Sequence, residues 1–157
     1  MATTQAKDPF ILKDVSVTLV RSSTVATGGT PVEFRCQLTQ AQLTPSASSA
    51  GGNSLDTFCE SYSDSGTSST WVLELAGFQA FKDINDFSIL SFQHEGEEVD
   101  FTLTPILRAD APISATNPSF TGVAKLVATP IGGTAKQYAV FTASLPVTGK
   151  PVMVITP

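Results

Sequence analysis

The residues best suited to acid–base chemistry lie between positions 94 and 98. His94 is the only histidine of the chain, and Glu95, Glu97 and Glu98 follow it closely. A histidine or a pair of carboxylates can act as general acid and base. These residues, however, span the expected end of a helix and the start of a strand, where polar side chains suit solvent and the last helix carbonyls. We therefore interpret them as a solvated surface and not as a paired-carboxylate site.

The rest of the chain offers no pattern typical of catalysis or metal binding. It contains neither a phosphate-binding P-loop nor a G-x-S-x-G sequence. Its glycine pairs at 28–29, 51–52 and 132–133 do not open a helix that could bind a phosphate. The sequence predicts a protein that is not an enzyme and that has no metal or cofactor.

The two cysteines, Cys36 and Cys59, have neither C-x-x-C spacing nor a histidine cluster beside them. We find no signal-peptide-like apolar stretch near the start, where the longest apolar run is Phe10-Ile11-Leu12. Both thiols are therefore expected to stay reduced in the cytosol. Cys36 alternates with apolar neighbours, which predicts that it packs as a small hydrophobic residue.

The composition favours a β-rich domain. Only 23 of the 157 residues are charged, which is 15% against a usual share of about 25%. Serine (17) and threonine (20) are abundant, and glycine and proline together add 21 residues. Exposed helix faces normally carry Glu, Lys and Arg, so a helical bundle is disfavoured. The length predicts one domain, residues 1–157.

The net charge of −5 argues against a protein that binds nucleic acid through its phosphates, because neutralising phosphates needs a basic surface. No apolar run reaches the ~20 residues needed to span a bilayer, so we expect no membrane insertion.

Alternating apolar and polar residues predict strands along most of the chain. The segments are 15–19, 32–39, 71–76, 98–104 and 152–155, with a hairpin of 120–131 and 134–145 around Gly132-Gly133. About seven short strands are typical of a sandwich or barrel. The predicted fold is a mainly β, two-sheet antiparallel β-sandwich.

Residues 82–96 predict one flanking α-helix. Ile84, Phe87 and Leu90 recur with helical spacing. Asp83 is the expected N-cap, and Gly96 suits the left-handed residue that ends a helix.

The segment from Thr44 to Thr70 predicts a long flexible loop, because it holds nine serines and three glycines. Leu55, Phe58 and Tyr62 lie in its middle. A partner surface would give these large apolar groups a place to dock. The alternative is a loop packed on its own side chains.

Several features follow one another in a recognisable order. The chain begins with a strand pair, and the polar loop with Leu55-Asp56-Thr57-Phe58 comes next. After this loop come, in order, Trp71–Gln79, the helix, Gly96–Phe101, Phe120–Val123 and a closing hairpin. Over nearly the whole chain this order resembles the tail tube (major tail) proteins of long, non-contractile-tailed bacteriophages. The inner tubes of contractile tails and of type VI secretion share that fold, so the fold alone does not identify the assembly to which the protein belongs.

The resemblance implies a structural virion protein. Its inner sheets would join into a β-barrel in hexameric rings, and the rings would stack into a tube through which double-stranded DNA passes during ejection into the host. The implied partners are other copies of the chain and further tail proteins such as the tape measure, tail terminator and distal tail protein. The implied location is the tail of the virion, after assembly in the host cytoplasm.

Four acidic strand residues are candidates to face such a lumen: Glu33, Glu74, Glu98 and Asp100. Six chains of net charge −5 would repel DNA phosphates, so that a duplex slides without binding. The alternative for each residue is an ordinary solvated outer face. The loop 44–70, with Leu55, Phe58 and Tyr62, and an N-terminal arm, residues 1–9, would contact a neighbouring ring.

A binding module is the other function left open, either a phage head decoration protein or a carbohydrate-binding β-sandwich that acts through its loops. Carbohydrate binding favours clustered exposed aromatic residues, and the chain has one Trp and two Tyr. The low charge suits assembly, because the buried parts of interfaces are depleted in Lys, Glu and Asp.

Overall fold

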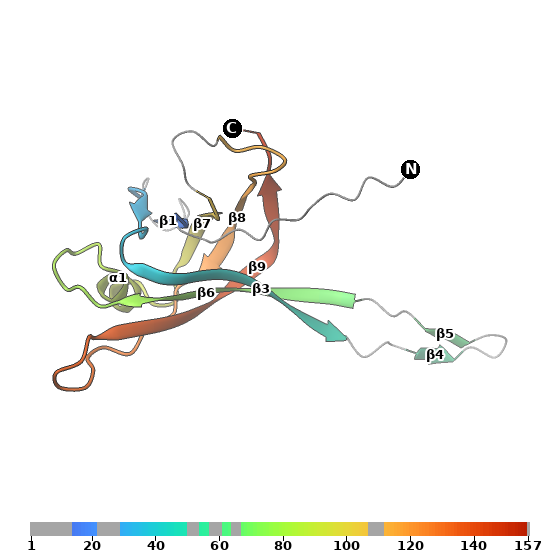
Figure 1. The fold of residues 1–157 in the computed structure, drawn as a ribbon. Coiled ribbons are helices and arrows are strands. Elements are labelled where there is room, and N and C mark those ends of the chain that lie inside the picture. The colour runs from blue at the N-terminus through green and yellow to red at the C-terminus, as the bar shows by residue number, and fades with distance from the viewer. Residues whose placement is uncertain are drawn as a thin grey trace.

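The computed structural model describes residues 14–21, 29–49, 54–56, 61–63, 67–106 and 112–156. This part of the chain forms one helix and nine strands (Figure 1). In chain order they are β1 (Ser16–Arg21), β2 (Val32–Glu33), β3 (Leu38–Ser49), β4 (Ser54–Asp56), β5 (Ser61–Ser63), β6 (Thr67–Phe78), α1 (Phe87–Gln93), β7 (Glu98–Thr104), β8 (Ser119–Lys125) and β9 (Val140–Val154).

Seven strands form one antiparallel sheet in the order β2-β1-β7-β8-β9-β6-β3. The long strand β9 connects its two halves, because residues 140–147 pair with β6 and residues 147–154 pair with β8. The sheet therefore curls into two facing layers, one of β2, β1, β7 and β8 and the other of β6 and β3 (Figure 1). The mainly β fold class with one helix is confirmed, and the two expected sheets are continuous through β9.

The core lies between these two layers. Strand alternation sends every second side chain inward, as in β7, where Val99, Phe101 and Leu103 are buried. Leu73 and Leu75 of β6 are buried from the opposite layer. The period-two pattern that predicted these strands is therefore the pattern that forms the core.

The helix α1 is shorter than the predicted segment 82–96, and its N-cap is Asp86 and not Asp83. The Asp86 carboxylate accepts a hydrogen bond from Ser88 N at 2.9 Å, while Asp83 accepts one from Asn85 N within the preceding turn. Gly96 has the predicted left-handed backbone, with a φ of +84°, but it lies two residues after the C-cap His94 and not directly after it.

The predicted strand 32–39 is wrong in its middle. Residues 35–37 form a turn, because the N–H groups of Gln37 and Leu38 both donate to Phe34 O. Cys36 lies in this turn and is exposed, so the prediction that it packs in the core is also wrong. Apolar and polar residues still alternate across this turn, so the alternation alone could not reveal that the strand is interrupted. Cys59 lies outside the described residues.

The predicted hairpin of 120–131 and 134–145 is wrong. Strand β8 ends at Lys125, and β8 pairs with the second half of β9. The buried side chain of Gln79 holds the intervening loop, since its Nε2 donates to Val140 O at 2.7 Å and to Pro130 O at 3.0 Å. Gly132 N donates to Gln79 Oε1 at 2.9 Å. This distant side chain replaces the strand partners that the sequence pattern predicted.

The predicted flexible loop 44–70 is corrected at both of its ends. Ser46–Ser49 of β3 pair with Thr67–Thr70 of β6, so these residues form a hairpin arm. A second, two-stranded sheet of β4 and β5 occupies part of the segment between them. Hydroxyl side chains are compatible with strands when the backbone is paired, and serine content alone did not distinguish the two structures.

Candidate functional site

The sheet has two open edges that could pair with another copy. β3 is one edge strand, and within the described residues it has a partner on one side only, β6. Its 12 residues include no Asp, Glu, Lys or Arg. At the other edge, β2 pairs with Thr18 and Leu19 of β1, and Phe34 N, directly after β2, donates to Val17 O at 3.0 Å. Proteins usually protect open edges with charges, proline or bulges; β3 has no charge, but it carries Pro45 and a register shift between Leu38 and Gln40.

The ends of strands β3 and β6 form an arm that extends beyond the other strands of the sheet (Figure 1). β9 pairs with β6 only over Trp71–Phe78, whereas β3 accompanies β6 out to Thr67. β4 and β5 lie farther out along the same hairpin (Figure 1). A hairpin without a third strand or a core beneath it is marginally stable alone, so a partner would stabilise this arm.

Of the predicted loop contacts, Leu55 and Tyr62 lie opposite one another in the β4–β5 pair. Phe58 lies outside the described residues. The structure thus brings two of the three positions together.

Three of the four candidate acids share one face of the sheet. Glu98 and Asp100 alternate along β7, and Asp100 is in register with Val20 of β1. Glu33 of β2 is in register with Thr18, which lies on the same outward face. All three are exposed. They form an acidic outer face on one half of the sheet.

The fourth acid, Glu74, lies apart from this group on β6, in register with Ser144 of β9. It accepts a hydrogen bond from Thr44 Oγ1 at 2.8 Å. Because it belongs to the outer face of the opposite layer, the structure does not bring it together with Glu33, Glu98 and Asp100.

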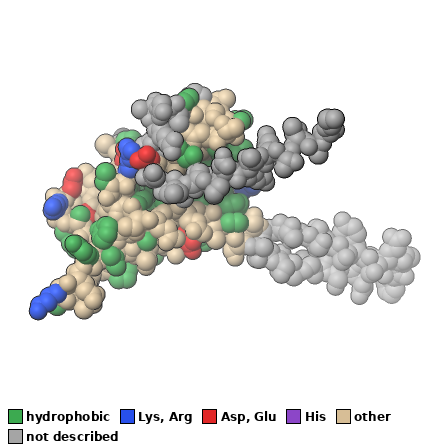
Figure 2. All heavy atoms as spheres, viewed as in Figure 1, with side chains coloured by type: hydrophobic (Ala, Val, Ile, Leu, Met, Phe, Trp, Pro, Cys, Tyr) green, Lys and Arg blue, Asp and Glu red, His purple; other side chains and the backbone are tan. Residues whose placement is uncertain are grey.

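An exposed apolar patch lies at the end of β6 farthest from the arm, and sequence reasoning did not identify it. Phe78 and Val140 are in register there, and Tyr138 packs edge-on against Phe78 with ring centroids 6.0 Å apart. Phe81 and Ile131 are also exposed, and green side chains gather at this end in Figure 2. These five residues are called the end patch below.

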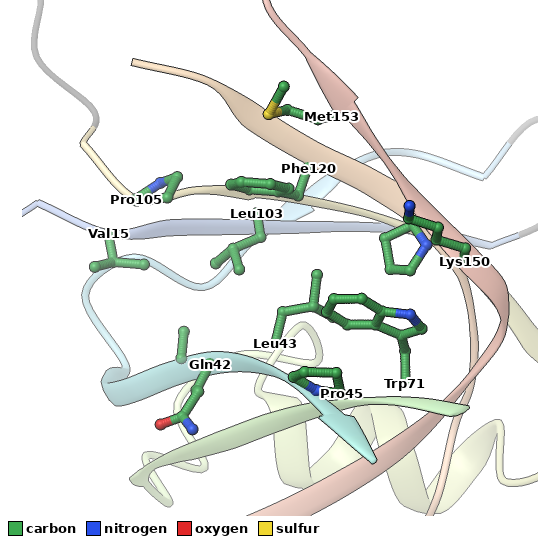
Figure 3. A pocket seen from close by; sticks show the side chains of 12 residues that line it. Val15, Gln42, Leu43, Pro45, Trp71, Leu103, Pro105, Phe120, Lys150 and Met153 are labelled. Atoms are coloured by element: carbon green, nitrogen blue, oxygen red, sulfur yellow. The ribbon is translucent and has the colours of Figure 1, made fainter. Parts of the chain in front are cut away.

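The sequence also gave no signal for a cleft of about 670 Å³ that lies between the two layers of the sheet. Leu43, Pro45 and Trp71 face Leu103 and Phe120 across it (Figure 3). Its lining comes from β3, β6, β7, β8 and the end of β9, so it exists only because the sheet curls.

Of the residues first considered for acid–base chemistry, His94 and Glu97 form a small ionic cluster with Arg21. Glu97 accepts from Arg21 Nε at 2.9 Å, and its other oxygen lies 3.2 Å from His94 Nδ1. Burial alone would raise the pKa of Glu97, but the hydrogen bonds from His94 and Arg21 and their positive charges lower it below its ordinary value. The cluster ties the end of β1 to the end of α1, which is a structural role.

Within the described residues, no group of three or more His, Cys, Asp and Glu side chains is arranged to hold a metal ion. No helix of this part is long and apolar enough to cross a membrane.

A structural comparison finds a chain with the same fold. Its source is the cryo-EM structure of the anti-feeding prophage (AFP) baseplate, six-fold symmetrised. The match has a TM-score of 0.54 at 10% sequence identity and covers 95% of this chain and 97% of that one. No protein-family model and no curated protein sequence matches the chain. The likeness concerns the fold.

Proposed function

We propose that this protein is a non-enzymatic structural subunit of a phage tail or a tail-like particle. Copies of the chain would form rings of six, and the rings would stack into a tube. The observation that carries the proposal is the uncharged edge strand β3 of the curled sheet, which within the described residues pairs on one side only. The fold shared with a prophage baseplate chain supports the same reading.

Lateral assembly would join edge β3 of one copy to the β1–β2 edge of the next. These edges are different surfaces, so the contact is heterologous and repeats around a ring or along a filament. Continuous backbone pairing between copies would satisfy the N–H and C=O groups that a lone subunit leaves to solvent.

Axial stacking would use the two ends of β6. The hairpin arm lies at the Thr67 end, and the end patch surrounds Phe78 at the other. An exposed apolar patch marks an interaction site, and the β4–β5 pair of the hairpin carries the apolar residues Leu55 and Tyr62, which would cover it. The arm and the end patch point away from one another along the same strand, as head-to-tail stacking of rings requires.

The face with Glu33, Glu98 and Asp100 would line the lumen. Its charge is partly balanced by Lys125, which is in register with Glu98. An acidic wall offers DNA phosphates no cationic contacts, so a duplex would pass without specific binding. We propose the other tail proteins, namely tape measure, terminator and distal tail protein, as further partners, and the virion tail, assembled in the host cytoplasm, as the location.

The test is electron microscopy of the concentrated protein together with a variant of the open edge. Thr39 and Gln40 are exposed residues of β3, and the double substitution to Lys would add the charges that protect natural edges. Wild-type protein should form rings or tubes, and the double variant should stay monomeric. Thr142→Lys is the control, since Thr142 is exposed on β9 within the sheet and not at its edge.

Wild-type protein that stays monomeric at high concentration would contradict the proposal. Monomers that decorate phage heads or bind glycans would instead support the binding-module alternative.

A further inference from the structure

The apolar core is closed at one end of the curled sheet and open at the other. At the closed end, Phe87 of α1 stacks on Phe141 with centroids 4.9 Å apart and meets Phe34 edge-on at 5.5 Å. At the open end lies the cleft of about 670 Å³ (Figure 3). The helix thus fills one opening between the layers, and the described residues supply no equivalent for the other.

The cleft walls are apolar enough to require cover. Leu43 and Trp71 on one side and Phe120 on the other are only partly buried. Protein interiors are packed to the density of organic crystals, with few voids larger than a water molecule. An apolar space that could hold several side chains is therefore expected to be occupied.

Two of the residues that line this cleft, Val15 and Pro105, are close in sequence to stretches of chain outside the described residues. Residues 107–111 follow Pro105 and Ile106, and they read Leu-Arg-Ala-Asp-Ala, with two charges in five residues. The other stretch precedes Asp14 and Val15, and Val15 itself lines the cleft. It contains Phe10-Ile11-Leu12, three large apolar residues in a row. Only this second stretch has a composition that suits the cleft.

The length of the chain allows this run to reach the cleft in the same molecule. Phe10 is five residues from Val15, and an extended chain covers at most about 3.6 Å per residue, so the reach is about 18 Å. The ion pair between Arg35 Nη2 and Asp14 Oδ1, at 2.9 Å, holds the chain beside the turn that precedes β3. The run therefore starts from a fixed point at the rim.

We propose that Phe10, Ile11 and Leu12 fill the cleft of their own subunit as a second apolar plug, opposite α1. This inference does not depend on the proposed assembly, because the plug and the cleft belong to one chain.

Trp71 provides the test, since it lines the cleft and is the only tryptophan of the chain. Replacing Phe10, Ile11 and Leu12 by Ser in the full chain should shift Trp71 emission to the red by several nanometres and increase binding of an apolar dye several-fold. Adding a peptide of residues 1–13 should reverse both changes. Thr3, Thr4 and Gln5 replaced by Ser form the matched control and should leave emission unchanged.

Unchanged emission and dye binding in a variant that keeps its circular dichroism spectrum would overturn the proposal. The single substitution Phe10→Ser serves if the triple variant does not fold. Wild-type emission that shifts to the red on dilution would also overturn it, because the plug would then come from a second copy.

Proteolysis provides an independent readout. Trypsin cleaves after Lys13, directly beside the apolar run. Ala41 lines the cleft, and Ala41→Phe would occupy the space and displace the plug. Cleavage at Lys13 should become several-fold faster in Ala41→Phe than in wild type. An equal rate in a folded variant would contradict the proposal.

Discussion

The Gln37 side chain donates a hydrogen bond from Nε2 to Asp86 Oδ2 at 2.7 Å, joining the turn before β3 to the start of α1. The same nitrogen donates to Phe78 O at 2.7 Å, and Gln37 Oε1 accepts from Phe87 N. Asp86 is only 4% exposed and also accepts from Ala80 N. Two side chains thus connect the helix to both β3 and β6 at the closed end of the core.

Asp86→Ala should lower the free energy of unfolding by about 3 kcal/mol, because it removes a helix cap and leaves buried donors unpaired. Urea denaturation measures the loss. Asp83→Ala is the control, since the exposed Asp83 carboxylate accepts hydrogen bonds from its neighbour Asn85, and its effect should stay within about 0.5 kcal/mol. Equal effects of the two substitutions would show that the buried network does not stabilise the fold.

Gly77→Ala should destabilise the protein by at least about 2 kcal/mol, because an added Cβ would lie 2.3 Å from Gln37 O. That backbone oxygen accepts from Phe78 N and cannot move without breaking the bond. Gly133→Ala is the matched control, with its nearest contact at an ordinary 3.5 Å. Thermal unfolding of both variants distinguishes them, and a Gly77→Ala protein as stable as wild type would refute the close approach.

The ionic cluster at Glu97 predicts a dependence on pH. Its pKa in the folded protein lies below the ordinary value of 4.5, so the ionised carboxylate stabilises the fold above that pH. The contribution should shrink as the pH falls below 4.5 and through the folded pKa. The difference in unfolding free energy between wild type and Glu97→Gln should therefore be constant near neutral pH, below about 1 kcal/mol in size, and decrease in acid.

Glu95→Gln is the control for this titration, because Glu95 is exposed. A Glu97→Gln difference that grows on acidification would contradict the direction of the shift.

The hairpin arm predicts a separation of folding from stacking. Ser46 and Thr70 are in register, so replacing residues 47–69 by Asn-Gly closes a two-residue turn between them. The shortened subunit should keep its core and thermal stability, since that core lies between β1, β6, β7 and β9. Under the proposed function it should form single rings and no tubes in the electron microscope. Tubes of normal length would show that the arm does not join rings.

The two outer faces of the sheet predict different effects of charge reversal. Glu98→Lys with Asp100→Lys would make the proposed lumen basic, and assembled tubes should then retain added double-stranded DNA on sedimentation. Glu74→Lys on the opposite layer should not cause retention. Retention by Glu74→Lys alone would assign the lumen to the β3–β6–β9 face, and retention by neither would remove the acidic-lumen proposal.

The sequence was informative where one local pattern decides the structure. Val99, Phe101 and Leu103 alternate as a strand and are buried as one, and Gly96 has the predicted left-handed backbone. The sequence was misleading where a residue far away in the chain decides the local structure. The cap at Asp86 depends on Gln37, and the loop after β8 depends on Gln79, 51 residues from Pro130.

The same difference between local patterns and distant partners applies to the candidate surfaces. Acidic strand positions can be found by alternation, but which of them share a face depends on the strand order, which separates Glu74 from Asp100. The cleft and the end patch arise from the curl of the sheet and the loop before β9, and neither leaves a periodic signal in the chain.

Because β9 belongs to both layers, the spacing between them is set by the path of one strand. That strand bends where Gly149 takes a φ of +73° and the pairing with β8 shifts register between Thr121 and Val123. The layers are joined by this strand and not by a connecting loop, since β9 pairs with β6 along one half and with β8 along the other. A force that separates the two layers would therefore act on β9 itself and on its backbone pairing with β6 and β8.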